Sequence, residues 1–189
     1  MKTLIFNGSP RKNGDTASLL RILTENLDGE VKIVNAYTCG ISPCIDCRYC
    51  WKHNGCAIKD GMQEIYKYVQ ECDNIVIASP VYFSELTGML LALGSRLQTY
   101  VAARYMRKER PVEKAKKGAV ILVGGGSGGV ERAFETTKEW MKVMYCTEQH
   151  ELVASRRTDH LPAIEDEQAV AGVKSIAAFF NGSKENLNQ

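Results

Sequence analysis

The chain has 189 residues, of which 24 are basic and 22 acidic, so its formal net charge is +2. This length suits one domain whose core needs no disulfides, and the near-neutral charge argues against a nucleic-acid-binding protein, which normally has a clear basic excess. No apolar run approaches the roughly 20 residues that cross a bilayer, and the apolar start at residues 3–6 is too short for a signal peptide. We therefore expect a cytoplasmic protein that has neither a nucleic acid nor a membrane as its partner.

Apolar runs rich in β-branched residues alternate with segments of helical period along the chain. We expect strands at residues 3–6, 31–34, 74–78, 119–123 and 152–154. Helices are expected to begin near residues 15, 60, 86, 131 and 170, and the third of them spans residues 86–101. Because most of the strand runs are continuously apolar, both faces of the sheet are expected to be covered.

These alternating units predict an α/β doubly wound parallel sheet of five strands with helices on both faces. We expect one domain over residues 1–180, with a cysteine-rich loop at 39–56 inserted after the second strand and a polar tail at 181–189. Ligands of such sheets bind beyond the carboxyl ends of the strands. The candidate binding segments are therefore the loops at 8–16, 37–59, 79–88 and 124–130.

The first loop, residues 8–16, joins a buried strand to the start of a helix, where unpaired amides favour an anion. Its side chains and those just after it add further donors, which are Ser9, Arg11, Asn13, Thr16 and Ser18. It is no nucleoside-triphosphate loop, because five residues separate Gly8 from Gly14 where four are needed, and Asp15 replaces the lysine. A phosphate monoester is the favoured ligand, and the alternative is a turn that caps the helix.

Two further loops carry weaker indications of a flat ligand. Residues 79–84 place aromatic side chains after a buried strand, where they can lie against a planar ring, although such residues also pack in cores. Residues 124–129 hold five glycines and match the dinucleotide pattern, but they follow the fourth strand rather than the first. We interpret this glycine loop as passing close to a flat ligand or a partner subunit, and the alternative is a flexible turn.

Five of the seven cysteines lie between Cys39 and Cys56, with gaps of two, two and five residues separating the last four of them. Three thiolates at such spacing can converge on a small polymetal centre, and a fourth can close it after the turn at Gly55, as a four-cysteine iron–sulfur site requires. Structural zinc usually draws two pairs of ligands from separate turns, and a redox dithiol needs only one pair. Free thiols without metal are the remaining alternative. Cys72 and Cys146 are expected, with Cys39, in or near the core.

Together, over about residues 1–130, these motifs resemble the flavodoxin-like NAD(P)H-dependent FMN reductases, specifically their iron–sulfur flavoprotein branch. The resemblance implies the flavodoxin-like strand order 2-1-3-4-5, an FMN phosphate loop at residues 8–16 and an isoalloxazine loop at 79–83. The expected FMN-binding residues are Ser9, Arg11, Asn13, Thr16, Ala17, Ser18, Pro80, Val81, Tyr82, Phe83, Ser84, Gly124, Gly125 and Gly126. The expected ligands of a [4Fe-4S] cluster are Cys44, Cys47, Cys50 and Cys56.

The chain departs from the family pattern at three places. Leu90-Leu91 stands where the family usually has a leucine–lysine pair, and Gly94-Ser95-Arg96 stands where it has isoleucine–aspartate–arginine. Gly61 replaces a common second aspartate. No role for that lysine or aspartate is therefore transferred to this chain.

The resemblance implies an FMN-dependent oxidoreductase that passes electrons from NAD(P)H to a quinone, a flavin or a ferredoxin-like carrier. No catalytic side chain is expected, because the flavin carries the chemistry. The alternative is a non-catalytic electron carrier or redox sensor. We also expect a homodimer or homotetramer, with Trp51, Tyr82 and the glycine loop facing the partner, unless these residues pack within one subunit.

Overall fold

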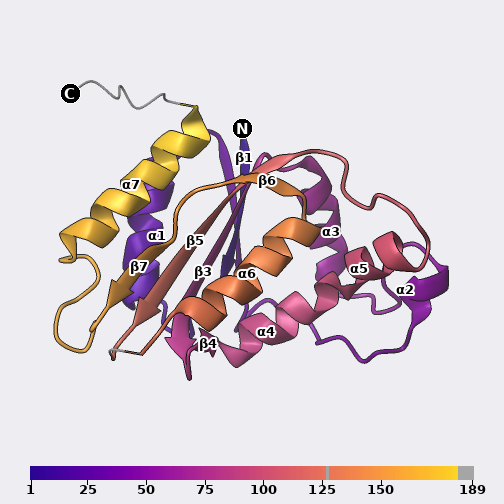
Figure 1. The fold of residues 1–189 in the computed structure, drawn as a ribbon, viewed down its shortest axis with the longest axis horizontal. Coiled ribbons are helices and arrows are strands. Elements are labelled where there is room, and N and C mark those ends of the chain that lie inside the picture. Colours follow the sequence, from indigo (N-terminus) through magenta and orange to yellow (C-terminus); the bar gives the residue numbers. More distant parts are fainter. Residues whose placement is uncertain (127, 183–189) are drawn as a thin grey trace.

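The computed structural model describes residues 1–126 and 128–182 (Figure 1). Its strands are β1 (Lys2–Asn7), β2 (Glu30–Asn35), β3 (Asn74–Tyr82), β4 (Glu85–Leu86), β5 (Lys116–Gly124), β6 (Cys146–Gln149) and β7 (Val153–Arg156). Its α-helices are α1 (Asp15–Glu25), α2 (Tyr49–Lys52), α3 (Met62–Glu71), α4 (Gly88–Gly94), α5 (Gln98–Tyr105), α6 (Glu131–Val143) and α7 (Glu167–Asn181). A short 3-10 helix, η1 (Ser95–Leu97), joins α4 to α5.

The sheet is the expected doubly wound parallel sheet, but the predicted five strands in the order 2-1-3-4-5 are wrong. In the described residues it has seven strands, with β2, β1, β3 and β5 side by side and both β6 and β7 parallel to β5. The two short strands share one edge of β5, because β6 pairs with residues 116–118 and β7 pairs with residues 121–124. β4 adds an antiparallel hairpin to the end of β3.

Both faces of the sheet are covered by helices, as the continuous apolar runs predict (Figure 1). Successive residues of a strand point to opposite faces. Ile5 of β1 packs in the apolar cluster that includes residues of α1 and α7, whereas Leu4 and Phe6 pack in the cluster that includes residues of α3, α4 and α6. Each fully buried leucine or isoleucine contributes about 1.5–3 kcal/mol of transfer free energy. The two-sided burial therefore fixes the sheet in the middle of the molecule.

No helix of the described ranges, 1–126 and 128–182, has the length and the apolar character that crossing a bilayer requires.

The predicted single helix over residues 86–101 is instead divided into α4, η1 and α5. The Ser95 hydroxyl donates to the Ala92 carbonyl at 2.6 Å, which competes with the helical pattern. The Tyr66 hydroxyl donates to the Arg96 carbonyl at 2.8 Å, so this carbonyl has a partner outside the helix. Arg96 lies in η1, and its side chain is buried beside the cysteine-rich loop.

Candidate functional site

Three of the candidate loops meet at one edge of the sheet. The strands β1, β3 and β5 are parallel neighbours, with Asn7 opposite Ala78 and Pro80 opposite Val123. Their carboxyl ends therefore lie side by side, and the loops that follow them, residues 8–14, 79–84 and 124–126, are brought together. This is the edge at which doubly wound sheets bind ligands.

The first loop is fixed where it leaves β1. The Gly8 amide donates to the Ala78 carbonyl at 2.8 Å, and the Thr87 hydroxyl donates to the Gly8 carbonyl at 2.8 Å. A Cβ atom on Gly8 would lie 2.7 Å from Leu90 Cδ2 and 2.8 Å from Ser79 Oγ. Only glycine fits this close approach, so the residue ties the loop to β3 and to the start of α4.

The loop leaves the amino terminus of α1 without a side-chain cap. Gly14 is the N-cap residue, and the Asp15 carboxylate is turned aside to accept from the Ala163 amide at 3.0 Å and from Arg11 at 3.2 Å. The first amides of an α-helix have no partner within it. Thr16 is buried there and Ala17 is half-buried, so their amides lie where an anion would bind.

The predicted donors of this loop differ in their surroundings. Ser9 is buried, and its hydroxyl is held within the loop, donating to the Arg11 carbonyl and accepting from the Arg11 amide at 3.2 Å. Arg11 and Asn13 are exposed, while the Ser18 hydroxyl donates to the Asp15 carbonyl at 2.8 Å. Sequence reasoning missed Asn7, whose side chain accepts from the Ser9 amide at 2.9 Å and so shapes the loop.

The second loop is a hairpin, because β3 continues to Tyr82 beyond the predicted strand end. Phe83 and Ser84 form its tip with φ values of 53° and 63°, a left-handed pair typical of a two-residue turn between twisted strands. Tyr82 is 47% exposed and Phe83 is 101% exposed, whereas Pro80 and Val81 are half-buried. The two aromatic side chains therefore do not pack in the core, which leaves their rings accessible to a planar ligand or a partner.

The third loop begins at Gly124, the last residue of β5, whose carbonyl accepts from the Thr158 amide at 3.1 Å. A Cβ atom on Gly125 would lie 2.5 Å from the Asp159 carboxylate, so this glycine permits a close approach of two chain segments. Gly126 has open space around it, and Ser127 lies outside the described residues. In the described part of the chain, Gly124 and Gly126 thus have no side chain against them, whereas the Asp159 carboxylate lies against Gly125.

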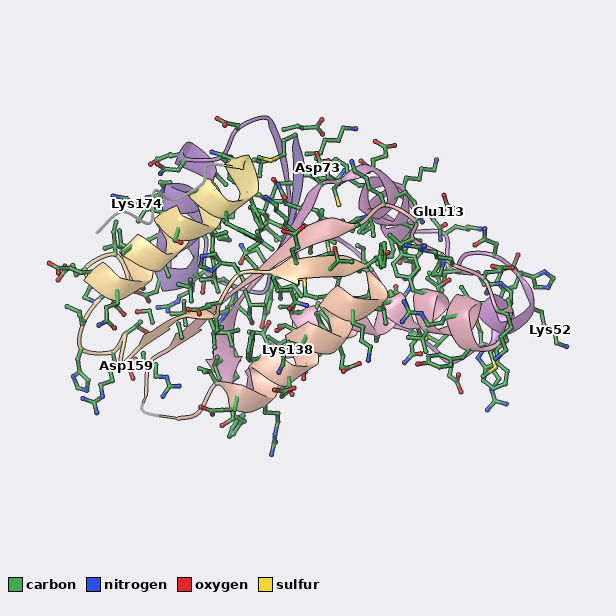
Figure 2. All side chains as sticks on the ribbon, turned by 45° about the horizontal axis from the view of Figure 1, so that its top comes forward. Lys52, Asp73, Glu113, Lys138, Asp159 and Lys174 are labelled. Atoms are coloured by element: carbon green, nitrogen blue, oxygen red, sulfur yellow. The ribbon has the colours of Figure 1, made fainter. Side chains whose placement is uncertain are left out.

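The four closely spaced cysteines lie beside α5, at the end of the molecule occupied by α2 (Figure 1). Cys44, Cys47, Cys50 and Cys56 line one cavity of about 70 Å³, together with Trp51 and Arg96. Figure 2 shows Lys52 of α2 at this end and Asp159, beside the glycine loop, towards the other. Within one chain, the cysteine cavity and the glycine loop are therefore separate regions.

Four thiols are among the possible metal donors of this cavity. Burial raises the pKa of the Cys50 thiol, and the charges of Cys44, Cys56 and Cys47 raise it further, so the four groups act on one another. Within the described ranges, no three His, Cys, Asp or Glu side chains are placed to hold one ion. Four cysteines that line one cavity are the type and number of residues that a four-cysteine iron–sulfur site uses.

The remaining cysteines are separate from this cavity. Cys72 and Cys146 are buried, and their burial raises the pKa of Cys72 to about 11 and that of Cys146 to about 12. Cys39 is half-buried against the core. The thiols of Cys72 and Cys146 are therefore protonated at neutral pH and are poor nucleophiles and poor ligands.

A buried ion pair ties together the two ends of the cysteine segment. The Arg96 side chain is fully buried, and its guanidinium donates to the Asp60 carboxylate at 2.7 and 3.2 Å. It also donates to the carbonyls of Ser42 at 2.9 Å and Ile58 at 3.3 Å, which flank the four cysteines. Asp60 in turn accepts from the amides of Ser42 and Met62, each at 3.1 Å. Sequence reasoning missed this function of Arg96, although an arginine within an apolar helical run was a visible signal.

Each member of this pair stabilises the charge of the other. Burial opposes the charged carboxylate of Asp60, but the hydrogen bonds from Arg96 and the two amides outweigh it and lower the pKa of Asp60. Burial likewise opposes the charge on Arg96, but the hydrogen bonds to Asp60 raise the pKa of the guanidinium above its ordinary value. Both groups are therefore ionised at neutral pH.

Two further contacts hold the segment in place. The Cys44 amide donates to the Ser95 hydroxyl at 2.9 Å, and Arg107 donates to the Cys50 carbonyl. The backbone of the cysteine segment has positive φ at Asp46, Arg48 and Gly55. This conformation is unfavourable for Asp46 and Arg48, because residues other than glycine carry a Cβ atom. The surrounding hydrogen bonds keep the segment in this conformation.

Comparison of the sequence with known proteins shows the family of the chain. A model of the NADPH-dependent FMN reductase family matches residues 1–158. The chain belongs to this family. It is 36% identical over 134 residues to an iron-sulfur flavoprotein of Archaeoglobus fulgidus, and the match covers 69% of this chain but just under two thirds, 66%, of that protein. It is 30% identical over 147 residues to an iron-sulfur flavoprotein of Methanosarcina thermophila, covering 76% of this chain and 74% of the relative.

Membership of the NADPH-dependent FMN reductase family, with these relatives, confirms the predicted family and its iron–sulfur flavoprotein branch. A solved structure of an NAD(P)H:quinone oxidoreductase from Methanothermobacter marburgensis has the same fold, with a TM-score of 0.68 and 15% identity. That likeness covers 100% of this chain and 99% of the other. It supports the fold, which is the doubly wound sheet described above.

The buried pair yields a prediction for stability. Replacing Asp60 by asparagine (Asp60→Asn) should lower the free energy of unfolding by about 3–5 kcal/mol at pH 7, because it leaves the Arg96 charge buried without its partner. Since the pKa of Asp60 is lowered in the folded protein, its stabilisation is complete above its unfolded pKa, about 3.9, and is lost as the pH falls through the folded pKa. The difference between the wild type and the variant, measured by urea unfolding, should therefore shrink below about pH 4.

The matched control for this prediction is Glu135→Gln. Glu135 forms an exposed pair with Lys138 at 2.5 Å on α6, and its loss should cost no more than about 0.5 kcal/mol. An equal loss in the two variants, or a loss for Asp60→Asn that does not change with pH, would contradict the assignment.

Proposed function

We propose that this protein is an FMN-dependent oxidoreductase that passes electrons from NAD(P)H, or from a reduced carrier, to a quinone, a flavin or another acceptor. The observation that carries the proposal is the meeting of an uncapped helix terminus, an exposed aromatic hairpin and a glycine loop at one edge of the sheet. Bound there, FMN would supply the chemistry, because it can accept a hydride and can release electrons one or two at a time.

The phosphate of FMN is proposed to bind at the amino terminus of α1. The amides of its first turn have no side-chain cap, and the buried Thr16 and the half-buried Ala17 and Ser18 lie in that turn. Ser9 and Asn13 would shape the loop, and Arg11 would move its charge from Asp15 to the phosphate. These groups would bind and orient the cofactor without taking part in the transfer of electrons.

The isoalloxazine ring is proposed to lie between the hairpin and the glycine loop. The hairpin offers the backbone of residues 80–84 and the exposed rings of Tyr82 and Phe83. On the other side, Gly124 and Gly126 present backbone in open space, so that a flat ring can approach closely, while the Asp159 carboxylate beside Gly125 would border the ring. This arrangement would exclude water from part of the ring while leaving an open side for the electron donor and acceptor.

We further propose that Cys44, Cys47, Cys50 and Cys56 bind a [4Fe-4S] cluster. Their spacing, the cavity that they share and the naming of the relatives as iron-sulfur flavoproteins support this proposal. The indole of Trp51 lines the same cavity and would help to keep water from the cluster.

The wider context of the protein is also proposed. Residues 1–180 would act as one FMN-binding domain in the cytoplasm, where reduced thiols persist. The exposed aromatic residues Trp51, Tyr82 and Phe83 would lie at the contacts of a homodimer or homotetramer. A monomer in light scattering at micromolar concentration would contradict this assembly.

The FMN site is tested by comparing two flavins that differ only in the phosphate. Arg11→Ala should weaken the binding of FMN by about tenfold, because one charge-assisted hydrogen bond to the phosphate is lost. The affinity for riboflavin, which has no phosphate, should not change. Lys174→Ala, which removes an exposed charge of α7 away from the cavity beside the loop, is the control and should leave both affinities as in the wild type. Fluorescence titration measures all of them, and equal losses for FMN and riboflavin would rule out a phosphate site at this loop.

The activity is tested by the oxidation of NAD(P)H with a quinone or free flavin as acceptor. The reconstituted protein should turn over faster than the same concentration of free FMN, because the bound ring is oriented toward both substrates. A rate equal to that of free FMN, together with rapid electron exchange with a ferredoxin, would instead support the non-catalytic carrier. The aromatic hairpin would then be a docking surface rather than a substrate site.

The cluster is tested on protein prepared without oxygen. The wild type should contain about four iron and four acid-labile sulfide atoms per chain, and Cys50→Ala should lose most of both while still binding FMN. Cys39→Ala is the control, because Cys39 lies outside the cavity, and it should retain the cluster. Stoichiometric FMN without iron in the wild type would refute the cluster but not the flavin site.

A further inference from the structure

Arg96 has one buried donor that the protein itself does not use. Both terminal nitrogens of its guanidinium are hydrogen-bonded, to Asp60, Ser42 and Ile58. Its Nε atom is also buried but has no hydrogen-bond partner among the described residues. Buried donors are rarely left unpaired in folded proteins, so an unpaired one indicates a missing partner.

The position of Arg96 indicates where that partner lies. Its side chain lines the cavity of the four cysteines, together with Trp51 and Ile58. The charge of Cys56 is among those that raise the pKa of Arg96, so the guanidinium and this thiol are close enough to interact. The Arg96 Nε–H is therefore a donor next to the space that a cluster would fill.

The ion pair of Arg96 and Asp60 has a defined orientation relative to this cavity. Asp60 binds to the two terminal nitrogens of Arg96 and is not one of the residues that line the cavity. The positive member of the pair thus stands between its carboxylate and the cysteines. The pair as a whole presents its positive end to the thiolates.

From this geometry we propose that Arg96 is a positioning residue that raises the reduction potential of the cluster. The inference rests on the proposed function, since it requires the cluster. Reduction adds one negative charge to a centre that four thiolates already make negative. A buried positive charge beside it stabilises the reduced form more than the oxidised form, and a hydrogen bond to sulfur acts in the same direction.

Because Arg96 also ties Ser42 to Ile58, a single substitution cannot separate its charge from its structural role. The two members of the pair can do so, since their charges have opposite signs. Arg96→Gln removes the positive charge, and Asp60→Asn removes the negative charge that partly offsets it. Both variants weaken the same tie across the cysteine segment, but they change the electrostatic potential in the cavity in opposite directions.

The experiment is a redox titration of the anaerobic holoprotein, followed by the electron paramagnetic resonance of the cluster. Arg96→Gln should shift the reduction equilibrium at least tenfold toward the oxidised form, which lowers the potential by about 59 mV for one electron. Asp60→Asn should shift the potential upward. The control is Arg104→Gln, which removes a charge of α5 that lines a different cavity, beside α6. It should move the equilibrium by less than about threefold.

The other outcomes of this experiment can be told apart. A bound cluster whose potential shifts in the same direction in both variants, or in neither, refutes the function of Arg96 and leaves the cluster in place. If Arg96→Gln loses the cluster, the upward shift of Asp60→Asn decides the question alone. If both variants lose it while binding FMN normally, the pair only holds the loop. A wild type that binds FMN but no iron refutes the cluster, and this inference with it.

Discussion

The burial of both faces of the central strands is the constraint on which the rest of the structure depends. A strand that is covered on both sides must satisfy its backbone groups entirely within the sheet. β1, β3 and β5 do so as parallel neighbours, and parallel pairing sends all three chains out at the same edge. The proposed FMN site is therefore a consequence of the core. The loops meet because the apolar strands before them pair in parallel within the buried sheet.

The cysteine segment follows a different principle, because it lies beyond the sheet and has little apolar surface to bury. Residues 42–49 are exposed, and the helix α2 within the segment has only four residues. Its position depends on polar contacts from the helices beside it, chiefly those of Arg96 with Asp60 and the flanking carbonyls. A buried pair of this kind contributes little net stability, but removing one member is costly. The segment is thus held by a few polar contacts rather than by the burial of apolar surface.

This difference explains what could be predicted from the sequence. The central strands and the helices that cover them follow from runs such as residues 74–78 and 119–123, whose burial leaves a local pattern. β4 and β6 leave no such pattern, since β4 has two residues and three of the four residues of β6 are exposed. The division of the predicted helix over 86–101 involves a local bond from Ser95 to Ala92 and a bond from Tyr66, which is distant in sequence. Short edge strands and long-range hydrogen bonds are decided by tertiary contacts that no local period records.

The candidate sites likewise contain residues that the sequence predicts and residues that only the structure identifies. Position and donor content singled out the loop at 8–16, because a strand end and a helix start are visible in the sequence. The cysteine spacing singled out the four thiols for the same reason. Arg96 and Asp60 are 36 residues apart in the sequence, and no sequence motif contains both of them. The ligands of a site can therefore be found by their spacing, whereas the groups that position them are found only in the folded chain.

The two sites also differ in how they would respond to evolutionary change. The phosphate loop and the glycine loop would bind mostly through backbone amides and close backbone approach, so that many side chains could be exchanged without losing FMN. The cysteine cavity requires four thiols and a buried charge, each of a fixed type. A chain of this fold can consequently lose its cluster by one substitution and still bind a flavin. Under the proposed function, flavin binding would follow from the fold, whereas an iron–sulfur centre would depend on the few contacts of the cysteine segment.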